Sequence, residues 1–178
     1  MDTIKVADGR FSYETTLGDE ATFIIVFPNY SELPVFGKSG TTAEISGDAS
    51  HLKEVEIHGE KNNEDMTAFR LSVANMTPPQ AKKAAEEYIS KNPKSIVSLY
   101  LIRKYLINTK EPDYEKAYTL TKAMVDADKN NAGASMLLSQ LKELRHVKKG
   151  GRLPSFSATD IEGKAVSGAK LKGKLNVI

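Results

Sequence analysis

The stretch that decides the fold is VEIHGEKNNEDMTAFRLSVANMTPPQAKKAAEEYI, residues 55–89, because the spacing of its apolar residues changes within it. Val55 and Ile57 alternate with polar neighbours, as in a strand with one buried face, and Gly59 follows them. Beyond Thr77 the apolar residues recur at intervals of three and four, which is the spacing of a helix face. Strands before this stretch and helices after it predict an α+β fold.

Short strands are expected throughout the sequence before Gly59. Residues 22–27 form a longer apolar run that predicts a central strand, and Asp8-Gly9 between alternating residues predicts a hairpin turn. Pro34 predicts that the short strand around it lies at the edge of a sheet. We therefore expect an antiparallel β-sandwich domain over residues 1–60. Its predicted core consists of Phe11, Tyr13, Phe23, Ile25 and Phe27.

The sequence after residue 60 predicts a helical spacer over residues 61–148, packed as an antiparallel array. A less regular pattern predicts a helix near residues 63–74, and four more helices are expected after it. The residues expected to open these four are Thr77 in a capping box, Asn92-Pro93, Pro112 or Asp113, and Asn130 or Asn131. The residues expected to pack between helices include Tyr88, Tyr100, Tyr105, Tyr114 and Tyr118.

Two of these helix starts suggest an internal repeat. Asn92 and Asn130 lie thirty-eight residues apart, a period similar to that of tetratricopeptide-like helical hairpins. The Trp-Leu-Gly-Tyr pattern of those repeats is absent, and two units are fewer than the roughly three that a solenoid needs. Simple antiparallel packing of helices is therefore the preferred interpretation, and a helical-repeat-like surface is the alternative.

The composition limits the chemistry of the chain. Its 178 residues include no cysteine, which excludes disulfides, thiolate metal sites and thiol catalysis within it. No run of about 18 apolar residues occurs, so no transmembrane segment is expected, and the first residues lack a signal-peptide pattern.

Residues 1–60 contain four basic and eleven acidic side chains, whereas residues 61–148 contain fifteen basic and ten acidic side chains. The basic residues are dispersed without interleaved aromatic residues, so no nucleic-acid partner is expected.

Two short motifs resemble ligand sites and fail on their surroundings. Asp126, Asp128 and Asn130 have the spacing of the first calcium ligands of an EF-hand, but the later glycine and glutamate are missing. This segment is better interpreted as a helix end and the next cap. The stretch Gly37-Lys38-Ser39-Gly40 lacks the approach and the following helix of a phosphate loop, so it predicts a turn.

The ionisable residues form no recognisable catalytic or metal-binding pattern. His51, His58 and His146 are isolated in the sequence, and no His-Glu-x-x-His spacing occurs. Glu54 and Glu56 are expected on one solvated face of a strand rather than as a catalytic pair. We therefore expect no catalytic residue, no cofactor-binding residue and no metal ligand in this chain.

The last part of the sequence, RLPSFSATDIEGKAVSGAKLKGKLNVI at residues 152–178, follows a Lys-Lys-Gly-Gly linker. It combines a Leu-Pro-x-Phe sequence, an Ile-Glu-Gly-Lys turn, a Lys-Gly-Lys and an apolar run from Leu175 to Ile178. This order resembles the start of a thioredoxin-like domain of the AhpC/TSA, ResA and TlpA type. The resemblance implies that residues 149–178 are a linker and the truncated start of such a domain, without its Cys-x-x-Cys.

A second resemblance concerns the strand region. Residues 2–13, the Val35-Phe36 pair, the Ile45-Ser46-Gly47-Asp48 step and residues 55–63 are similar to a domain of unknown function. That domain precedes thioredoxin-like domains in envelope thiol–disulfide oxidoreductases of some Gram-negative bacteria. The resemblance therefore covers most of the chain, in the order of strand domain, helical spacer and thioredoxin-like start.

Together the resemblances imply the accessory N-terminal region of an envelope thiol–disulfide oxidoreductase, itself redox-inert. Such a region would position the redox domain, bind a protein client or dimerise. The expected location is the periplasm or the envelope, and the expected partners are protein clients, the redox domain, or a second copy paired through Leu175 to Ile178. The alternative is a stand-alone, non-enzymatic module that binds proteins or peptides on its helical surface.

Overall fold

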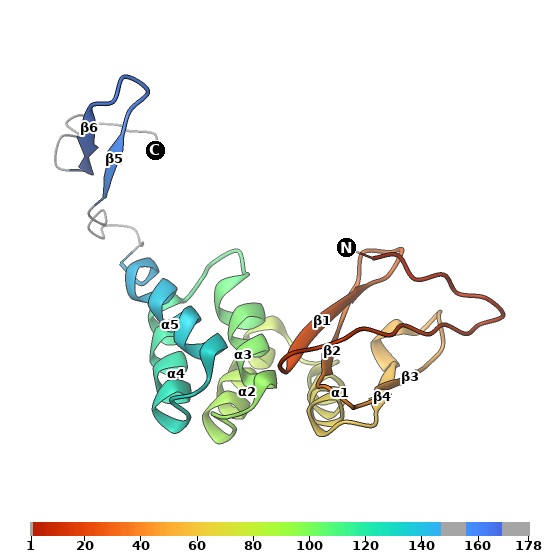
Figure 1. The fold of residues 1–178 in the computed structure, drawn as a ribbon. Coiled ribbons are helices and arrows are strands. Elements are labelled where there is room, and N and C mark those ends of the chain that lie inside the picture. The colour runs from red at the N-terminus through yellow and green to blue at the C-terminus, as the bar shows by residue number, and fades with distance from the viewer. Residues whose placement is uncertain (1, 147–155, 169–178) are drawn as a thin grey trace. The chain divides into compact units, whose positions relative to one another are not determined.

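The computed structural model describes residues 2–146 and 156–168 and confirms the α+β class (Figure 1). The chain divides into two compact units, Met1–Thr77 and Pro78–Ile178, which are described separately below. Strands and one helix make up the first unit, and helices dominate the second. The predicted domain limits at residues 60 and 148 stay predictions.

The first unit contains two separate two-stranded antiparallel sheets instead of the expected sandwich. In one sheet β1 (Ala21–Val26) pairs with β2 (Glu32–Gly37), and in the other β3 (Glu44–Ser46) pairs with β4 (Glu56–His58). The short 3-10 helix η1 (Leu52–Glu54) precedes β4, and the helix α1 (Lys61–Val73) follows it. The sandwich prediction was wrong because a helix, and not further strands, covers the edges of β2 and β4.

The two sheets share one apolar core. The odd-numbered residues of β1 and β2 and those around β3 and β4 face it, as the two-residue period of a strand requires. The buried members are Leu33, Val35, Val55 and Ile57, and the partly buried ones include Phe23, Ile25, Phe27 and Ile45. Two residues expected in this core are instead exposed: Phe11 is 43% and Tyr13 is 48% accessible. Residues 10–16 form no strand, so no ladder holds their alternating side chains against the core.

The turn predicted at Asp8-Gly9 is present. Asp8 and Gly9 have φ angles of 51° and 71°, as a two-residue hairpin turn requires. Ala7 and Arg10 exchange both backbone hydrogen bonds across it, at 2.9 and 3.0 Å. The pairing does not continue into regular strands on either side.

Helix α1 attaches to both sheets through polar side chains that bind strand backbone. The buried side chain of Asn63 accepts a hydrogen bond from the Phe36 amide at 2.7 Å and donates one to the Phe36 carbonyl oxygen at 2.8 Å. One turn later the Thr67 hydroxyl oxygen accepts from the Ile57 amide at 3.2 Å. Arg70 then donates to the Val55 carbonyl oxygen. Residues spaced by three and four share one helix face, so α1 presents a polar ladder to β2 and β4.

The second unit is built from helices joined by short connections (Figure 1). Helices α4 and α5 lie against one another, and α2 contacts α3. The bounds are α2 Pro78–Lys91, α3 Ile96–Ile102, a π-helical continuation η2 Arg103–Ile107, α4 Tyr114–Ala127 and α5 Ala132–Leu144. The fully buried residues include Ala85, Leu101, Leu106, Met124 and Leu141. The five tyrosines expected between helices are half-buried.

Three of the four predicted helix starts match the structure: α2 begins at Pro78, directly after Thr77, and α4 and α5 are each capped by one of the two residues expected there. Asp113 caps α4 by accepting from the Lys116 amide, and Asn131 caps α5 by accepting from the Ala134 amide. Helix α3 begins later than predicted, because Ser95 is its cap and accepts from the Val97 amide. Asn92 instead ends the preceding helical stretch, where its amide donates to the carbonyl oxygens of Tyr88 and Ile89.

The last described residues, 156–168, contain a small hairpin. Strands β5 (Ser157–Thr159) and β6 (Ala165–Ser167) pair across a turn at residues 160–164. The Asp160 carboxylate accepts from the amides of Glu162 and Lys164, and Gly163 has a φ of 81°. This is the turn that the Ile-Glu-Gly-Lys sequence predicts. The predicted linker at residues 148–151 and the predicted strand from Leu175 to Ile178 lie outside the described residues.

We predict that Asn63→Ala lowers the free energy of unfolding of the first unit by about 2–4 kcal/mol, because two buried backbone groups lose their partners. Urea titration followed by circular dichroism measures this loss, and faster exchange of the Phe36 amide proton localises it. Asn62→Ala is the matched control, since its bonds to Glu20 and Glu60 are exposed or half-exposed and water replaces them. Equal losses in the two variants would contradict the assigned role of Asn63.

Candidate protein-interaction surface

The outer edge of β1 is open within residues 2–146 and 156–168, where only β2 pairs with this strand. The amide and the carbonyl of Phe36 are hydrogen-bonded to the Asn63 side chain, so they point away from β1. Thr22 lies opposite Phe36 in the β1–β2 ladder, and opposite residues of an antiparallel pair point their backbone groups either toward each other or both outward. The amide and the carbonyl of Thr22 therefore point away from β2. The hydrogen bond from the Phe27 amide to Ser31 confirms that the odd-numbered residues of β1 face β2. The amides and carbonyls of Thr22, Ile24 and Val26 therefore face the open edge.

The side chains on this edge are apolar and accessible. Ile24 is 42% and Val26 is 45% exposed, on the face of β1 opposite the core. Residues 21–27 contain no charge, no proline and no glycine. Edge strands of native proteins usually contain charged residues or proline, which prevent pairing with another chain. Because β1 has neither, its edge is open to a further strand.

This edge also corrects a sequence prediction. The apolar run at residues 22–27 predicted a central strand with neighbours on both sides, whereas β1 has one neighbour in the described structure. The apolar pattern of a strand does not show how many strands lie beside it, because the pattern indicates which side chains are buried and not which backbone groups are paired. Pro34, by contrast, was correctly predicted at an edge, and it stands at an outward-facing position where β1 needs no donor.

Acidic groups stand at the start of this edge. Partial burial raises the pKa of the Glu20 carboxyl, the Glu60 carboxylate raises it further, and Lys38 and the hydrogen bond from Asn62 oppose the shift. The Glu20 residue as a whole is exposed, so the carboxyl group is withdrawn from water only in part. The charge on Glu20 at neutral pH therefore opposes folding of this corner.

The turn segment ahead of β1 exposes further apolar side chains. Val6 is 65% accessible, and with Phe11 and Tyr13 it belongs to the exposed residues on either side of the Asp8-Gly9 turn. The Tyr13 hydroxyl donates to the Asp2 carboxylate at 2.8 Å, and this contact raises the pKa of Tyr13 above its ordinary value. The phenol is protonated at neutral pH, so it can donate this hydrogen bond there.

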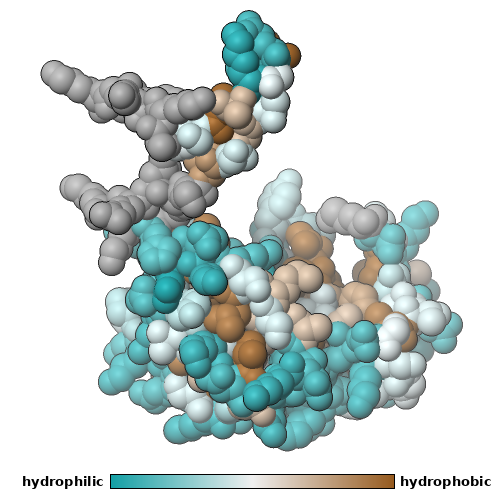
Figure 2. Space-filling view, turned by 60° about the vertical axis from the view of Figure 1, so that its left-hand side comes forward, coloured by the Kyte–Doolittle hydropathy of each residue, from teal (hydrophilic) through white to brown (hydrophobic). Residues whose placement is uncertain are grey.

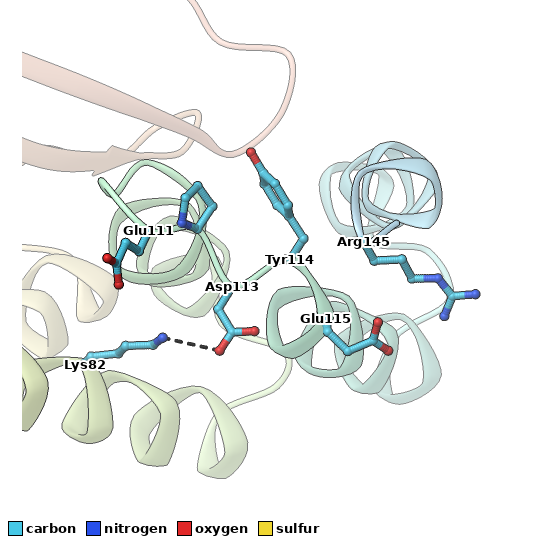
Figure 3. A pocket seen from close by; sticks show the side chains of 7 residues that line it. Lys82, Glu111, Asp113, Tyr114, Glu115 and Arg145 are labelled. Carbon is cyan, nitrogen blue, oxygen red and sulfur yellow. Dashed lines mark hydrogen bonds and ion pairs between the residues drawn. The ribbon is translucent and has the colours of Figure 1, made fainter. Parts of the chain in front are cut away.

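The second unit has a shallow hollow of about 360 Å³ beside the start of α4. Its lining residues are Lys82, Glu111, Pro112, Asp113, Tyr114, Glu115 and Arg145. Figure 3 shows the Lys82 ammonium directed at the Asp113 carboxylate, and the two form an ion pair at 3.3 Å. The Arg145 guanidinium points away from this pair and lies 4.2 Å from the centre of the Tyr118 ring.

The charges around this hollow serve helix packing. Asp113 accepts from the Lys116 amide at 3.0 Å as well as pairing with Lys82. The Lys116 ammonium pairs with Glu86 at 3.4 Å, so two ion pairs of opposite polarity join α2 to the start of α4. No nucleophile and base lie within hydrogen-bond reach in this set, so the hollow offers a mixed-charge surface and no catalytic geometry.

The remaining residues singled out in the sequence lie apart from one another. The His58 ring nitrogen lies 3.1 Å from Glu56 on β4, His51 lies 3.6 Å from Asp48, and His146 is exposed beyond α5. The hydroxyl and amide of Ser50 lower the pKa of Asp48. Among the residues that the structure describes, no cluster of three metal-ligating side chains occurs.

The two ligand-like motifs have structural roles. Asp126 pairs with Lys122 at 2.6 Å, and Asp128 ends α4 and accepts from the Asn130 amide. Gly37 ends β2, and residues 38–41 form a turn in which Gly40 has a φ of 77°. Both motifs are therefore local structure, as their incomplete patterns predict.

Sequence reasoning missed the open edge and the polar ladder of α1. The edge left a signal, since an uncharged run of β-branched and aromatic residues at 22–27 lacks the protection of an ordinary edge strand.

On the face shown in Figure 2 hydrophilic residues predominate and hydrophobic residues form small separate groups. In the described part of the chain no helix has the length and apolarity needed to cross a bilayer. The candidate surface is the open edge of β1, where Ile24 and Val26 are exposed.

The comparisons with known proteins concern the same unit. The family model described as a domain of unknown function (DUF4369) matches residues 1–66, which include β1 to β4 and the first six residues of α1. The searches of curated proteins and of solved structures returned no match. The similarity therefore extends over the residues that form the open edge and ends within α1.

We predict that Glu20→Gln stabilises the first unit at pH 7, because it removes a carboxylate that burial and Glu60 disfavour while its side-chain oxygen can still accept from Asn62. A carboxyl with a raised pKa binds its proton more tightly in the folded state, so the stability it contributes is lost as pH rises. The gain should therefore disappear below about pH 4, where glutamate is protonated in both states. Urea titrations of both proteins at pH 7 and below about pH 4 measure the gain in the free energy of unfolding. A gain of the same size at the lower pH would contradict the prediction.

We predict that Asp113→Ala destabilises the second unit by about 1 kcal/mol, because α4 loses its cap. Asp113→Asn is the matched variant, since the amide oxygen can still cap the helix while the ion pair with Lys82 is lost. Its loss should stay within about 0.5 kcal/mol, the range of an exposed ion pair. Thermal unfolding followed at the helical circular-dichroism band distinguishes the two, and equal losses would show that charge and not capping matters.

Proposed function

We propose that this chain is the redox-inert accessory region of a thiol–disulfide oxidoreductase of the cell envelope. In this role the first unit holds a protein by its strand edge, and the second unit separates that contact from a redox domain. The reaction of the complete enzyme would be disulfide exchange by attack of a thiolate on a disulfide. The chain itself contributes no reacting atom, because it contains no cysteine.

The observation that carries this proposal is the order of segments along one chain. The matched domain of unknown function occupies residues 1–66, and the sequence from residue 152 resembles the start of a thioredoxin-like domain. The β5–β6 hairpin, with its turn at residues 160–164, agrees with that resemblance at the one part the structure describes. The proposed periplasmic or envelope location rests on the resemblance alone.

The helical unit supports the second candidate, a non-enzymatic module that binds proteins or peptides. The hollow beside α4 joins an aromatic ring, a proline and charges of both signs on one accessible surface. Such a surface can hold an extended segment through side-chain contacts, without any reaction. The two candidates differ in what the native polypeptide contains, because only the first requires a reactive pair of cysteines.

The test is to identify the native polypeptide in source cells with an antibody raised against this chain. The accessory role predicts a polypeptide longer than the 178 residues here, in the envelope fraction, whose migration shifts with a maleimide–polyethylene glycol reagent after reduction. The purified chain, by contrast, should leave insulin reduction by dithiothreitol at the rate of the buffer control. A native polypeptide without reactive thiols would contradict the proposal and leave the binding module.

A further inference from the structure

We propose that β1 pairs with β1 of a second copy of this chain, antiparallel and centred on Ile24, to form a four-stranded sheet in a closed dimer. The strand order would be β2, β1, then β1 and β2 of the second copy. This inference names one partner for the proposed accessory region, yet it rests on the geometry of the first unit alone. It holds or fails whatever redox domain accompanies the chain.

The open edge is complementary to itself in this register. Because Thr22, Ile24 and Val26 all direct their backbone groups outward, each can form a hydrogen-bonded pair with an outward residue of another β1. Centring the pairing on Ile24 sets Ile24 opposite its symmetry mate and Thr22 opposite Val26. The accessible apolar side chains of Ile24 and Val26 then pack across the two-fold axis, where cross-strand apolar pairs stabilise a sheet.

The register also keeps like charges apart. Residues 21–27 are uncharged, and Glu20 would stand opposite Pro28 of the second copy while Asp19 stands opposite Asn29. The four basic and eleven acidic side chains of residues 1–60 still give two first units a net repulsion. Salt screens repulsion between exposed charges, so raising the salt concentration should strengthen this dimer. It should weaken the binding of a basic peptide to the same edge.

The assembly stops at two copies because the other edge of the sheet is closed. An additional strand beside β2 would find both backbone groups of Phe36 bound to Asn63 and no amide donor at Pro34. The β1–β2 sheet of each copy therefore has one edge that can pair, the β1 edge, and a two-fold contact joins these edges of the two copies. The closed edge of β2 therefore favours a pair of copies over an open series of strands.

The absence of cysteine makes a direct test possible. Residues in a hydrogen-bonded antiparallel pair have Cα atoms about 5.5 Å apart, within the range of a disulfide. Under mild oxidation the full chain with Ile24→Cys should form a covalent dimer about tenfold or more faster than the chain with Tyr30→Cys, because pairing raises the local thiol concentration. Tyr30 is the control because it is 88% exposed in the β1–β2 turn, outside the ladder. Equal rates for the two variants would overturn the pairing.

A charge-swap experiment tests the register without a covalent bond. Ile24→Lys and Ile24→Glu should each sediment as monomers, because like charges would face one another across the axis. An equimolar mixture should recover the dimer, because opposite charges then meet at the same position. Circular dichroism of each variant confirms that it is folded. A mixture that stays monomeric would contradict the register.

Sedimentation of the unmodified chain over a concentration series at two salt concentrations completes the test. A monomer–dimer equilibrium that shifts toward dimer at the higher salt supports the proposal. A monomer at every concentration, or a dimer that Ile24→Lys leaves intact, overturns it. Neither result bears on whether the native polypeptide has reactive thiols, so the proposed enzyme role is judged separately.

Discussion

The two hydrogen bonds between the Asn63 side chain and the backbone of Phe36 are the contact on which the first unit depends. A side-chain amide has one donor and one acceptor side by side, so it can replace the backbone of a neighbouring strand. With this pair satisfied, β2 needs no third strand, and α1 is fixed against the sheet. Thr67 repeats the device on β4 with a single hydrogen bond. The small sheets persist because a helix, and not a larger sheet, completes their hydrogen bonding.

The parts of this fold that follow from periodicity could be predicted, and those that follow from pairing could not. Alternation located β1 to β4, although it also predicted strands on both sides of Asp8-Gly9 that do not form, and helical spacing located most helix starts of the second unit. Asp113 and Asn131 were each one of two residues expected to open a helix, because capping chemistry is local. The sandwich was wrong because the decisive groups on α1 are polar. A helix that binds strand backbone through Asn63 and Thr67 shows a weak apolar stripe, so its true neighbours leave little trace in an apolar pattern.

The open edge of β1 is a second case in which strand pairing could not be predicted from the sequence pattern. The run at residues 22–27 carries the composition of a strand between two neighbours, and the structure supplies one of them. Either the outer edge of β1 at Ile24 and Val26 stays unpaired, or another strand pairs with it. Exposed β-branched residues on an unprotected edge promote association, so a sequence that keeps them uncharged is consistent with a specific occupant. The mismatch between the sequence pattern and the observed pairing is therefore a reason to propose assembly at this edge.

A closed pairing would also fit a region that has no chemistry of its own. Joining two chains at β1 places everything attached to them at a high local concentration, without any contact between the attached parts. For the proposed oxidoreductase this would bring two redox centres into one particle. The consequence requires that assembly end at two copies, since an open series of strands would aggregate. The capped edge of β2 supplies that limit, so the hydrogen bonds of Asn63 would determine both the shape of the unit and the size of its assembly.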